Sequence, residues 1–329
     1  MDVSYAPEKV VNRAHHAHSG AHPRLNENAL VMARVSGQIA HPVMRGNPYR
    51  IGHDGIARVL PSTGGIALNQ RIGDPCIGLA GDHIEPGVAL HNNSREVVGP
   101  RDGPNTALLT LSCIGNLAEV IDGPCAGQRG IVTGKHGGVN HVLIDFPTPV
   151  LARLRIGDRI QIRAHGAGVA LLDYPDIEVM NCAPALLRAW GLYERERQLL
   201  VPITHTIPAA LMGSGLGKNT AWRGDYDIQL ADRRLRDRYR LGSLRFGDMV
   251  AIVNADTRRG PLFNTGKITI GIIVHGDSTV SGHGPGVTPL LTGPARQLIP
   301  LRRAQANLAA LLGVRRLPTA QNFRALTDR

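Results

Sequence analysis

Histidine and aspartate gather in a glycine-rich stretch, residues 275–283, that follows an apolar run. That run, Ile268–Val274, is rich in β-branched residues and predicts a buried strand. A strand that ends in a polar, glycine-rich loop is a common way to present chemistry, because glycine lets the backbone pass close to a bound group. The alternative is a tight turn whose polar side chains cap their own backbone. The candidate catalytic residues are His275, Asp277 and His283.

A second group of potential ligands lies in the N-terminal half, where Asp82, His83 and Glu85 fall within four residues. Imidazole and carboxylate groups drawn from several loops are what a divalent metal site requires. A metal-free site that uses His and Asp as base and acid stays open. The expected metal ligands are Asp82, His83, Glu85 and Asp256. The wider pool of candidates also includes His165, His205, Asp225 and Asp227.

The loop 212–220 combines several glycines with one lysine, as anion-binding loops do. It is not a P-loop, because Met212 stands where the first glycine is needed and Asn219 replaces the serine or threonine that would contact magnesium. We therefore expect no nucleotide cofactor, and a looser role in holding an anionic group of a substrate. The expected substrate-binding residues are Gly215, Gly217, Lys218 and His205.

Composition narrows the class of protein. The chain has 329 residues, a formal net charge of +11 and a pI of about 10.1, which favours anionic partners. Aromatic residues make up only 4% of the chain, too few for the stacking surfaces of single-strand binders, so nucleic acid is not the expected partner. The four cysteines lack a CxxC spacing, and neither a signal peptide nor a membrane span is recognisable. A cytoplasmic protein is expected.

Short strands should dominate the fold, because 39 glycines and 22 prolines favour turns over long helices. Two segments, 183–198 and 301–312, have helical periodicity, whereas 106–120 is apolar enough for a buried strand. The expected class is a β-rich α+β fold with barrel- or sandwich-like units. We expect a flexible tail over residues 1–28, a β-rich unit over 29–180, and an α+β unit over 181–329 packed on it as one globular body.

One short pattern occurs three times. Arg71–Asp74, Arg155–Asp158 and Arg245–Asp248 each place Gly-Asp directly before a strand-like segment. A polar step follows each strand, and the first two of these steps contain glycine. The pattern indicates related β units whose strand ends meet at a common cleft, unless Gly-Asp before a strand is merely a frequent turn.

Four segments taken together resemble a bacterial and archaeal family of unknown function: Arg50–Gly55, Gly81–Gly87, Gly134–Gly138 and 268–286. The resemblance covers most of residues 30–300 and implies no assigned activity. The chain is also similar to acetamidase/formamidase-type amidohydrolases, which are β-rich and repeat strands led by Gly-Asp. It lacks the acidic Gly-Asp-Gly-Glu motif of those enzymes, so their substrate and mechanism do not carry over.

Taken together, the sequence predicts a hydrolase for an amide or related C–N bond of a small, polar, anionic molecule, with a divalent metal ion as a possible cofactor. A metal ion would lower the pKa of its bound water towards neutrality. The alternative is a non-catalytic protein that binds small molecules or forms assemblies. A homo-oligomer that does not associate with membranes is expected in either case.

Overall fold

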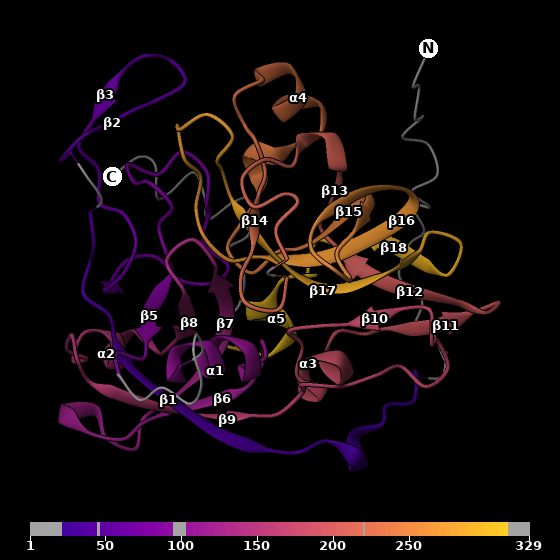
Figure 1. The fold of residues 1–329 in the computed structure, drawn as a ribbon, viewed down its shortest axis with the longest axis horizontal. Coiled ribbons are helices and arrows are strands. Elements are labelled where there is room, and N and C mark those ends of the chain that lie inside the picture. The colour runs from indigo at the N-terminus through magenta and orange to yellow at the C-terminus, as the bar shows by residue number, and fades with distance from the viewer. Residues whose placement is uncertain (1–21, 45–46, 95–102, 220, 315–329) are drawn as a thin grey trace.

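A closed six-stranded β-barrel occupies the N-terminal half of the chain (Figure 1). In this computed structural model, residues 22–44, 47–94, 103–219 and 221–314 are described. The strands follow the order β1-β9-β6-β7-β8-β5, and β5 pairs again with β1, which closes the sheet without free edges. The barrel strands are β1 (Ala33–Ile39), β5 (Gly87–His91), β6 (Leu117–Val120), β7 (Arg129–His136), β8 (His141–Asp145) and β9 (Arg159–Ala164).

Alternating side chains explain the barrel. In β9, Ile160, Ile162 and Ala164 are buried while the residues between them are more exposed, which is the period of two that a strand imposes. The inward residues form one apolar cluster whose members all lie between Ile39 and Ile162. Helix α1 (Pro104–Leu111) packs on β1 and adds Leu108 to that cluster.

A second sheet fills the C-terminal half and is antiparallel except for one pair. Its order is β10-β17-β16-β15-β13, with β14 paired to β17 and β13 running parallel to β15. Every residue of β17 is buried, so this strand is covered on both faces. The strands are β10 (Glu178–Val179), β13 (His205–Pro208), β14 (Tyr226–Asp227), β15 (Met249–Asp256), β16 (Leu262–Ile273) and β17 (Gly286–Pro294).

Smaller elements complete the molecule. A three-stranded sheet holds β11 (Tyr193–Arg195), β12 (Gln198–Ile203) and β18 (Leu298–Arg302), and a hairpin holds β2 (Arg50–Ile51) and β3 (Ala57–Arg58). Strand β4 (Ile66–Ala67) pairs with β5. The remaining helices are α2 (Thr148–Leu151), α3 (Pro184–Ala189), α4 (Arg233–Arg238) and α5 (Leu308–Leu311). Short 3₁₀ turns occupy Glu27–Ala29, Gly123–Cys125, Ala209–Leu211 and Leu241–Ser243.

The expected β-rich class with few helices is confirmed, but three expected elements differ. Helix α3 ends soon after Ala189 because Gly191 takes a φ of 75°, a conformation that terminates helices. Residues 301–302 belong to β18, which pairs in parallel with β12, so helix α5 is only four residues long. Residues 106–111 are helical and not a strand, since Pro104 begins α1 and the strand starts only at Leu117.

The three Gly-Asp turns share one geometry. In each, the Asp carboxylate accepts a hydrogen bond from the backbone N–H of the Arg three residues earlier, at 2.8, 2.9 and 2.9 Å. The intervening glycine has a φ of 91°, 91° and 82° respectively. A left-handed conformation in the third position explains why glycine occupies it. Two of the turns lead into β9 and β15, so the motif starts strands in both halves.

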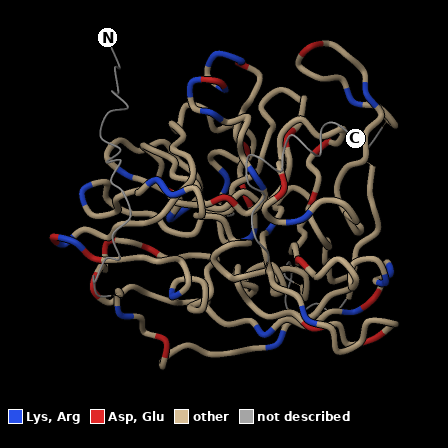
Figure 2. The backbone as a smooth tube through the Cα atoms, turned by 180° about the vertical axis from the view of Figure 1, so that it is seen from behind, with Lys and Arg blue, Asp and Glu red and all other residues tan. Residues whose placement is uncertain are grey.

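The two halves share a core. One apolar cluster combines barrel residues such as Leu143 with second-sheet residues such as Leu290 and Met249. No helix in the described ranges is long and apolar enough to cross a membrane. Lysine and arginine are spread around the fold, with one concentration in the short helix α4 (Figure 2). The expected tail falls largely on residues 1–21, outside the described residues.

Candidate functional site

Five histidines and four carboxylates gather where the barrel meets the second sheet. They come from the loop before β5, the adjoining ends of β7 and β8, β14 and the residue before it, and the segment between β16 and β17. Strand ends from both halves therefore supply the site. Its members are Asp82, His83, Glu85, His136, His141, Asp225, Asp227, His275 and His283.

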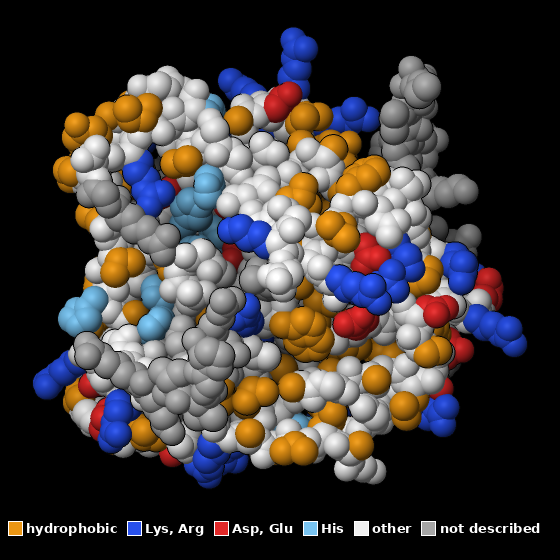
Figure 3. Space-filling view, viewed as in Figure 1, with side chains coloured by type: hydrophobic (Ala, Val, Ile, Leu, Met, Phe, Trp, Pro, Cys, Tyr) orange, Lys and Arg blue, Asp and Glu red, His pale blue; other side chains and the backbone are white. Residues whose placement is uncertain are grey.

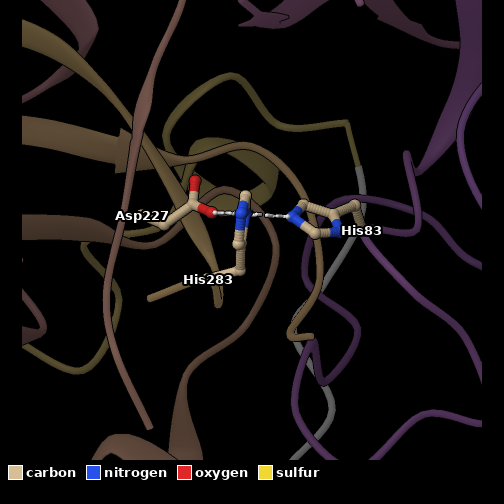
Figure 4. A group of neighbouring side chains, drawn as sticks. All are labelled: His83, Asp227 and His283. Atoms are coloured by element: carbon tan, nitrogen blue, oxygen red, sulfur yellow. Dashed lines mark hydrogen bonds and ion pairs between the residues drawn. The ribbon is translucent and has the colours of Figure 1, made fainter. Parts of the chain in front are cut away.

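Three of these side chains, which we call the outer group, are His83, Asp227 and His283. They point at one another from three separate segments (Figure 4). His283 Nδ1 lies 3.0 Å from His83 Nε2 and 3.0 Å from Asp227 Oδ2, and the latter two atoms are 3.5 Å apart. Ligands about 2.1 Å from one ion are separated by about 3.0 to 3.4 Å in octahedral or tetrahedral geometry. The triangle therefore has the size of one face of a metal coordination shell.

Asp82 fixes the orientation of the His83 ring through the ring nitrogen that does not face the outer group. Its Nδ1 lies 3.0 Å from Asp82 Oδ1, and the same oxygen accepts a 2.7 Å hydrogen bond from Ser278 Oγ. Burial raises the pKa of Asp82, but the bonds from His83 and Ser278 outweigh it and bring the pKa to about 2. An ionised Asp82 keeps the proton on Nδ1, so the Nε2 lone pair faces the outer group. A carboxylate behind a ligating histidine is the usual support of a metal site.

A second triplet, the inner group, consists of His136, Asp225 and His275, whose ligand atoms lie within 4.8 Å of one another. His275 is completely buried, and both of its ring nitrogens face acceptors: Nδ1 is 2.9 Å from Gly276 O, and Nε2 is 2.7 Å from Asp225 Oδ2. A neutral imidazole has only one N–H. His275 is therefore an imidazolium, or it shares a single proton with Asp225 across their 2.7 Å contact.

One histidine of each group has a raised pKa, because the neighbouring carboxylates favour its positively charged form. Burial lowers the pKa of His275, but Asp225 and Asp227 raise it well above its ordinary value. His83 follows the same pattern, since Asp227 and Asp82 outweigh its burial and raise its pKa. Buried carboxylates without compensating cations are too costly to retain. The cluster thus requires protonated histidines, metal ions, or both.

Glu85 supports the inner group as Asp82 supports the outer one. It accepts from His136 Nδ1 at 2.7 Å and from His141 Nδ1 at 3.0 Å. Burial raises the pKa of Glu85, but the bonds from these two histidines lower it by more than burial raises it. The pKa therefore lies below its ordinary value, and the carboxylate is ionised. With Nδ1 of His136 committed to Glu85, the Nε2 of that ring is directed to Asp225 and His275.

Asp227 joins the two groups. Its Oδ2 belongs to the outer triangle, and its Oδ1 lies 3.5 Å from His275 Nε2. The rings of His136 and His275 stack at 4.2 Å between centroids, and His83 lies 5.1 Å from His275. A carboxylate with one oxygen in each group is the arrangement of a bridged two-metal centre.

Glycines let the backbones approach closely enough to build the site. A Cβ on Gly286 would stand 2.1 Å from Asp225 Oδ2 and 2.2 Å from His275 Nε2. Gly137 and Gly224 meet in the same way, and the N–H of Gly137 donates to Asp225 Oδ1 at 2.8 Å. The glycine-rich composition of these loops is therefore a packing requirement of the inner group.

Lys135 braces the segment that leads to Asp225. It is completely buried on the face of β7 opposite His136, and its Nζ donates to Asn181 Oδ1 at 2.7 Å and Trp222 O at 2.9 Å. Burial lowers the pKa of Lys135 to about 8. The amine thus holds the approach to Asp225 by hydrogen bonds.

The structure brings together most, but not all, of the residues selected from the sequence. His83, His275 and His283 contribute ring nitrogens, while Asp82 and Glu85 orient histidines from behind. Asp277 instead accepts from Gly78 N at 2.9 Å, and burial raises its pKa. It braces the His83 loop, because its carbonyl also accepts from His83 N.

Asp256 lies away from the cluster. It ends β15, whereas the segment carrying His275 adjoins the beginning of that strand at Met249, about 23 Å away at 3.3 Å per residue. Its carboxylate forms an ion pair with Arg258 at 2.6 Å. Strand β15, which was expected to place Asp256 at a common cleft, places it at the opposite end of the sheet.

The expected substrate-binding residues divide in two. His205 contacts Thr204 and Ser243 through its ring nitrogens, at 2.9 and 3.0 Å. The glycine-rich loop does adjoin the site, because Ser214 N donates to Gly282 O and a Cβ on Gly215 would meet Asp225 O at 3.0 Å. Gly217 and Lys218 at its far end are exposed, and the carbonyl of Lys218 abuts Gly260.

Sequence reasoning did not select Asp225, Asp227, His136 or His141 for the site. The first two stood in the pool of candidates, and their spacing, Asp-Tyr-Asp, places both carboxylates on one side of an extended segment. His136 and His141 carried a weaker signal, because five residues apart they meet only through the turn between β7 and β8.

Comparison with known proteins places this geometry in a family. Models of a domain of unknown function, DUF4438, match residues 49–188 with the N-terminal part and residues 189–312 with the C-terminal part. A solved structure described as "Crystal structure of TM1086" is 41% identical and superimposes with a TM-score of 0.82, covering 88% of this chain and 99% of that chain. No curated protein matches.

Proposed function

The chain belongs to the DUF4438 family, and we propose that it is a metal-dependent hydrolase whose centre is built on the outer and inner groups. The observation that supports this proposal most directly is the outer triangle of His83, Asp227 and His283, with edges of 3.0, 3.0 and 3.5 Å. Imidazole and carboxylate ligands suit zinc and related divalent ions.

The chain's own groups supply the remaining parts of a hydrolytic site. A metal ion held by the outer group would bring the pKa of a bound water near 7. His275 and Asp225 lie beside Asp227 and can hold or give up a proton there. His283 is the accessible member, with 35% of its side chain exposed, so a substrate would approach from its side.

The proposed reaction is hydrolysis of an amide or related C–N bond of a small polar molecule, because a water activated by a metal ion can add to a carbonyl carbon that the same ion polarises. Water would add to the carbonyl carbon, the C–N bond would break, and the leaving nitrogen would take a proton from the His275–Asp225 pair. Asp227 lies between the outer group, which would activate the water, and the His275–Asp225 pair, which would hold the proton.

Metal analysis of full-length, untagged protein tests the proposal. His15, His16 and His18 lie outside the described residues and can bind metal themselves, so all three are first changed to Gln. In that background we expect at least one zinc or manganese ion per chain, and its loss in Asp227→Ala. A panel of small amides should release amine or ammonia, chelation should stop the release, and added Zn²⁺ should restore it.

Two results would contradict the proposal. A chain that neither retains metal nor binds added Zn²⁺ or Mn²⁺ has no metal centre. A chain that binds metal at Asp227 but hydrolyses none of the amides would support the alternative, a non-catalytic binding protein.

A further inference from the structure

A pocket opens beside the outer group, under the β2–β3 hairpin. Asp82, which holds His83, forms part of its wall, together with Arg50, Arg58, Ser62 and Thr279. On this side of the molecule, histidine side chains reach the surface with basic side chains on either side of them (Figure 3). The pocket thus adjoins the proposed metal centre through Asp82 and is lined by two arginines and one carboxylate.

The two arginines of the pocket are not equivalent. Arg58 is paired bidentately with Asp54, at 2.9 and 2.5 Å, so its charge is matched within the hairpin. Arg50 has a single ion pair among the described residues, with Nη1 3.1 Å from Asp82 Oδ2, and 40% of its side chain is exposed. A guanidinium has five N–H donors, so this pair leaves donors for a ligand.

The contact between Arg50 and Asp82 is itself incomplete. Asp82 Oδ2 is buried and has no hydrogen-bond partner of good geometry, although the ion pair at 3.1 Å lies beside it. The other oxygen of Asp82 serves His83 and Ser278. Arg50 is therefore attracted to the pocket wall without being locked there, which is the state expected of a cation that exchanges between a protein carboxylate and a ligand.

The hairpin is fixed to the same loop that carries His283. The N–H of His53 donates to Thr279 O at 2.7 Å, and a Cβ on Gly52 would stand 3.0 Å from Thr279 Oγ1. The hairpin that carries Arg50 is thus held at a defined position relative to the outer group, while the Arg50 guanidinium can exchange between Asp82 and a ligand. A rigid support of this kind is what a specificity residue needs.

We propose that this pocket is the subsite for an oxyanion of the substrate, a carboxylate or a phosphate, and that Arg50 is its principal ligand. The inference rests on the proposed function, because it gives the substrate of that centre a charged end. Arg50 is connected to the outer group through Asp82 and His83, so a small substrate anchored on Arg50 could extend towards His283, the exposed member of that group. Arginine suits this role because its planar fork matches both oxyanions.

Anion binding to the full-length protein tests the subsite, with inorganic phosphate and acetate as probes. Titrations are made with and without Zn²⁺, so that anion bound to a metal ion is told apart from anion bound to the pocket. Arg50→Gln should weaken binding of the preferred probe about tenfold or more, which corresponds to one charge-assisted pair. Arg50→Lys should recover part of the loss, since it restores charge without the fork.

Arg129→Gln is the matched control, because Arg129 is 64% exposed on the barrel and 3.9 Å from its partner Glu119. It should leave anion binding unchanged. Binding of phosphate alone, of acetate alone, or of both supports the subsite and identifies the oxyanion. Equal binding by wild type and Arg50→Gln, or binding of neither probe, overturns it.

The outcome is separable from that of the proposed function. Metal content is read from the same Arg50→Gln protein and should equal that of the wild type. Equal anion binding by wild type and Arg50→Gln, with metal retained in both, rejects only the subsite. Absence of metal in the wild type rejects the proposed function, while the effect of Arg50 on anion binding can still be measured without Zn²⁺.

Discussion

The outer and inner groups contain the same kinds of side chain but are built for different tasks. In the outer group the closest ligand atoms are 3.0 Å apart and His283 is 35% exposed. In the inner group Asp225 lies 2.7 Å from His275, which is completely buried. The first is an open triangle that can admit an ion and a substrate. The second is already closed by a His–Asp pair.

The difference shows what burial does to identical ligands. A buried histidine beside a carboxylate can satisfy the charge of its partner by keeping a proton, and the raised pKa of His275 corresponds to this arrangement. An exposed histidine such as His283 has water as an alternative partner, so its ring nitrogen is available to a metal ion. Metal should therefore bind more readily in the outer group, with the inner group as proton store or second metal site.

Removal of Asp227 should have the largest effect, because it is the one residue with an oxygen in each group. Asp227→Ala is expected to abolish metal retention and to lower amide hydrolysis by more than about 100-fold. This exceeds the roughly 10- to 100-fold loss that is typical when a residue that only orients a metal ligand is removed. The measurements are metal per chain and kcat/KM.

Asp256→Ala is the matched control for Asp227→Ala. It removes a buried aspartate of the same sheet that lies at the far end of β15 and pairs with Arg258. Some stability should be lost but metal content should stay at the wild-type value. Equal metal loss in both variants would mean that the cluster is not the site.

A substitution at Gly286 should distinguish the two groups, because it should disrupt the inner group and leave the outer group in place. Gly286→Ala introduces a Cβ 2.1 Å from Asp225 Oδ2 and 2.2 Å from His275 Nε2, so the inner pair must move. Overpacking of this kind costs about 1–3 kcal/mol of unfolding free energy. We expect a lower Tm and a disrupted inner group, while one metal ion per chain is retained.

Gly242→Ala serves as the control, since nothing lies within 4 Å of a Cβ there and its φ is not left-handed. It should leave both Tm and metal content near the wild-type values. If Gly286→Ala removed all metal, the outer group would depend on the inner one and the two would be a single unit.

The supporting carboxylates should act selectively and more weakly. Asp82→Asn should reduce metal affinity of the outer group by about 10- to 100-fold, because Asn no longer fixes the proton of His83 on Nδ1. Glu85→Gln should act on the inner group through His136 and should also lower stability, since Glu85 additionally binds Gly64 N. Competition titrations with a chelator measure both, and equal losses in the two variants would contradict separate supports.

The sequence predicted the components of this site better than their assembly. Ile160, Ile162 and Ala164 alternate as a half-buried strand must, and the three Gly-Asp turns were visible as a repeat. Barrel closure was not visible, because the pairing of β1 with β5 depends on contacts between residues about fifty positions apart. The helix expected over 301–312 is present only at Leu308–Leu311, and its beginning is wrong for the same reason: parallel pairing of β18 with β12 overrides local helical propensity.

Local spacing also explains which site residues were recognised. Asp82, His83 and Glu85 lie within four residues, so their density was apparent in the chain. Asp225 and His136 meet only because Gly137 and Gly224 bring two distant backbones together. Asp256 was included because it follows a strand, but β15 runs away from the cluster.

His205 should have the smallest effect on the metal centre and gives the clearest contrast in pKa. It is buried like His275, but burial, together with the nearby Arg302 and Arg240, lowers its pKa to about 4. Because the folded pKa lies below the unfolded value of about 6.5, stability is present above pH 6.5 and is lost as pH falls towards 4.

His205→Gln, which cannot take up a proton, should reduce the loss of unfolding free energy between pH 6.5 and 4. Denaturant titrations across that range measure it, with metal content expected to stay unchanged at pH 7. An unaltered pH dependence in His205→Gln would mean that burial does not hold this histidine neutral, and reduced metal binding would place it in the site after all.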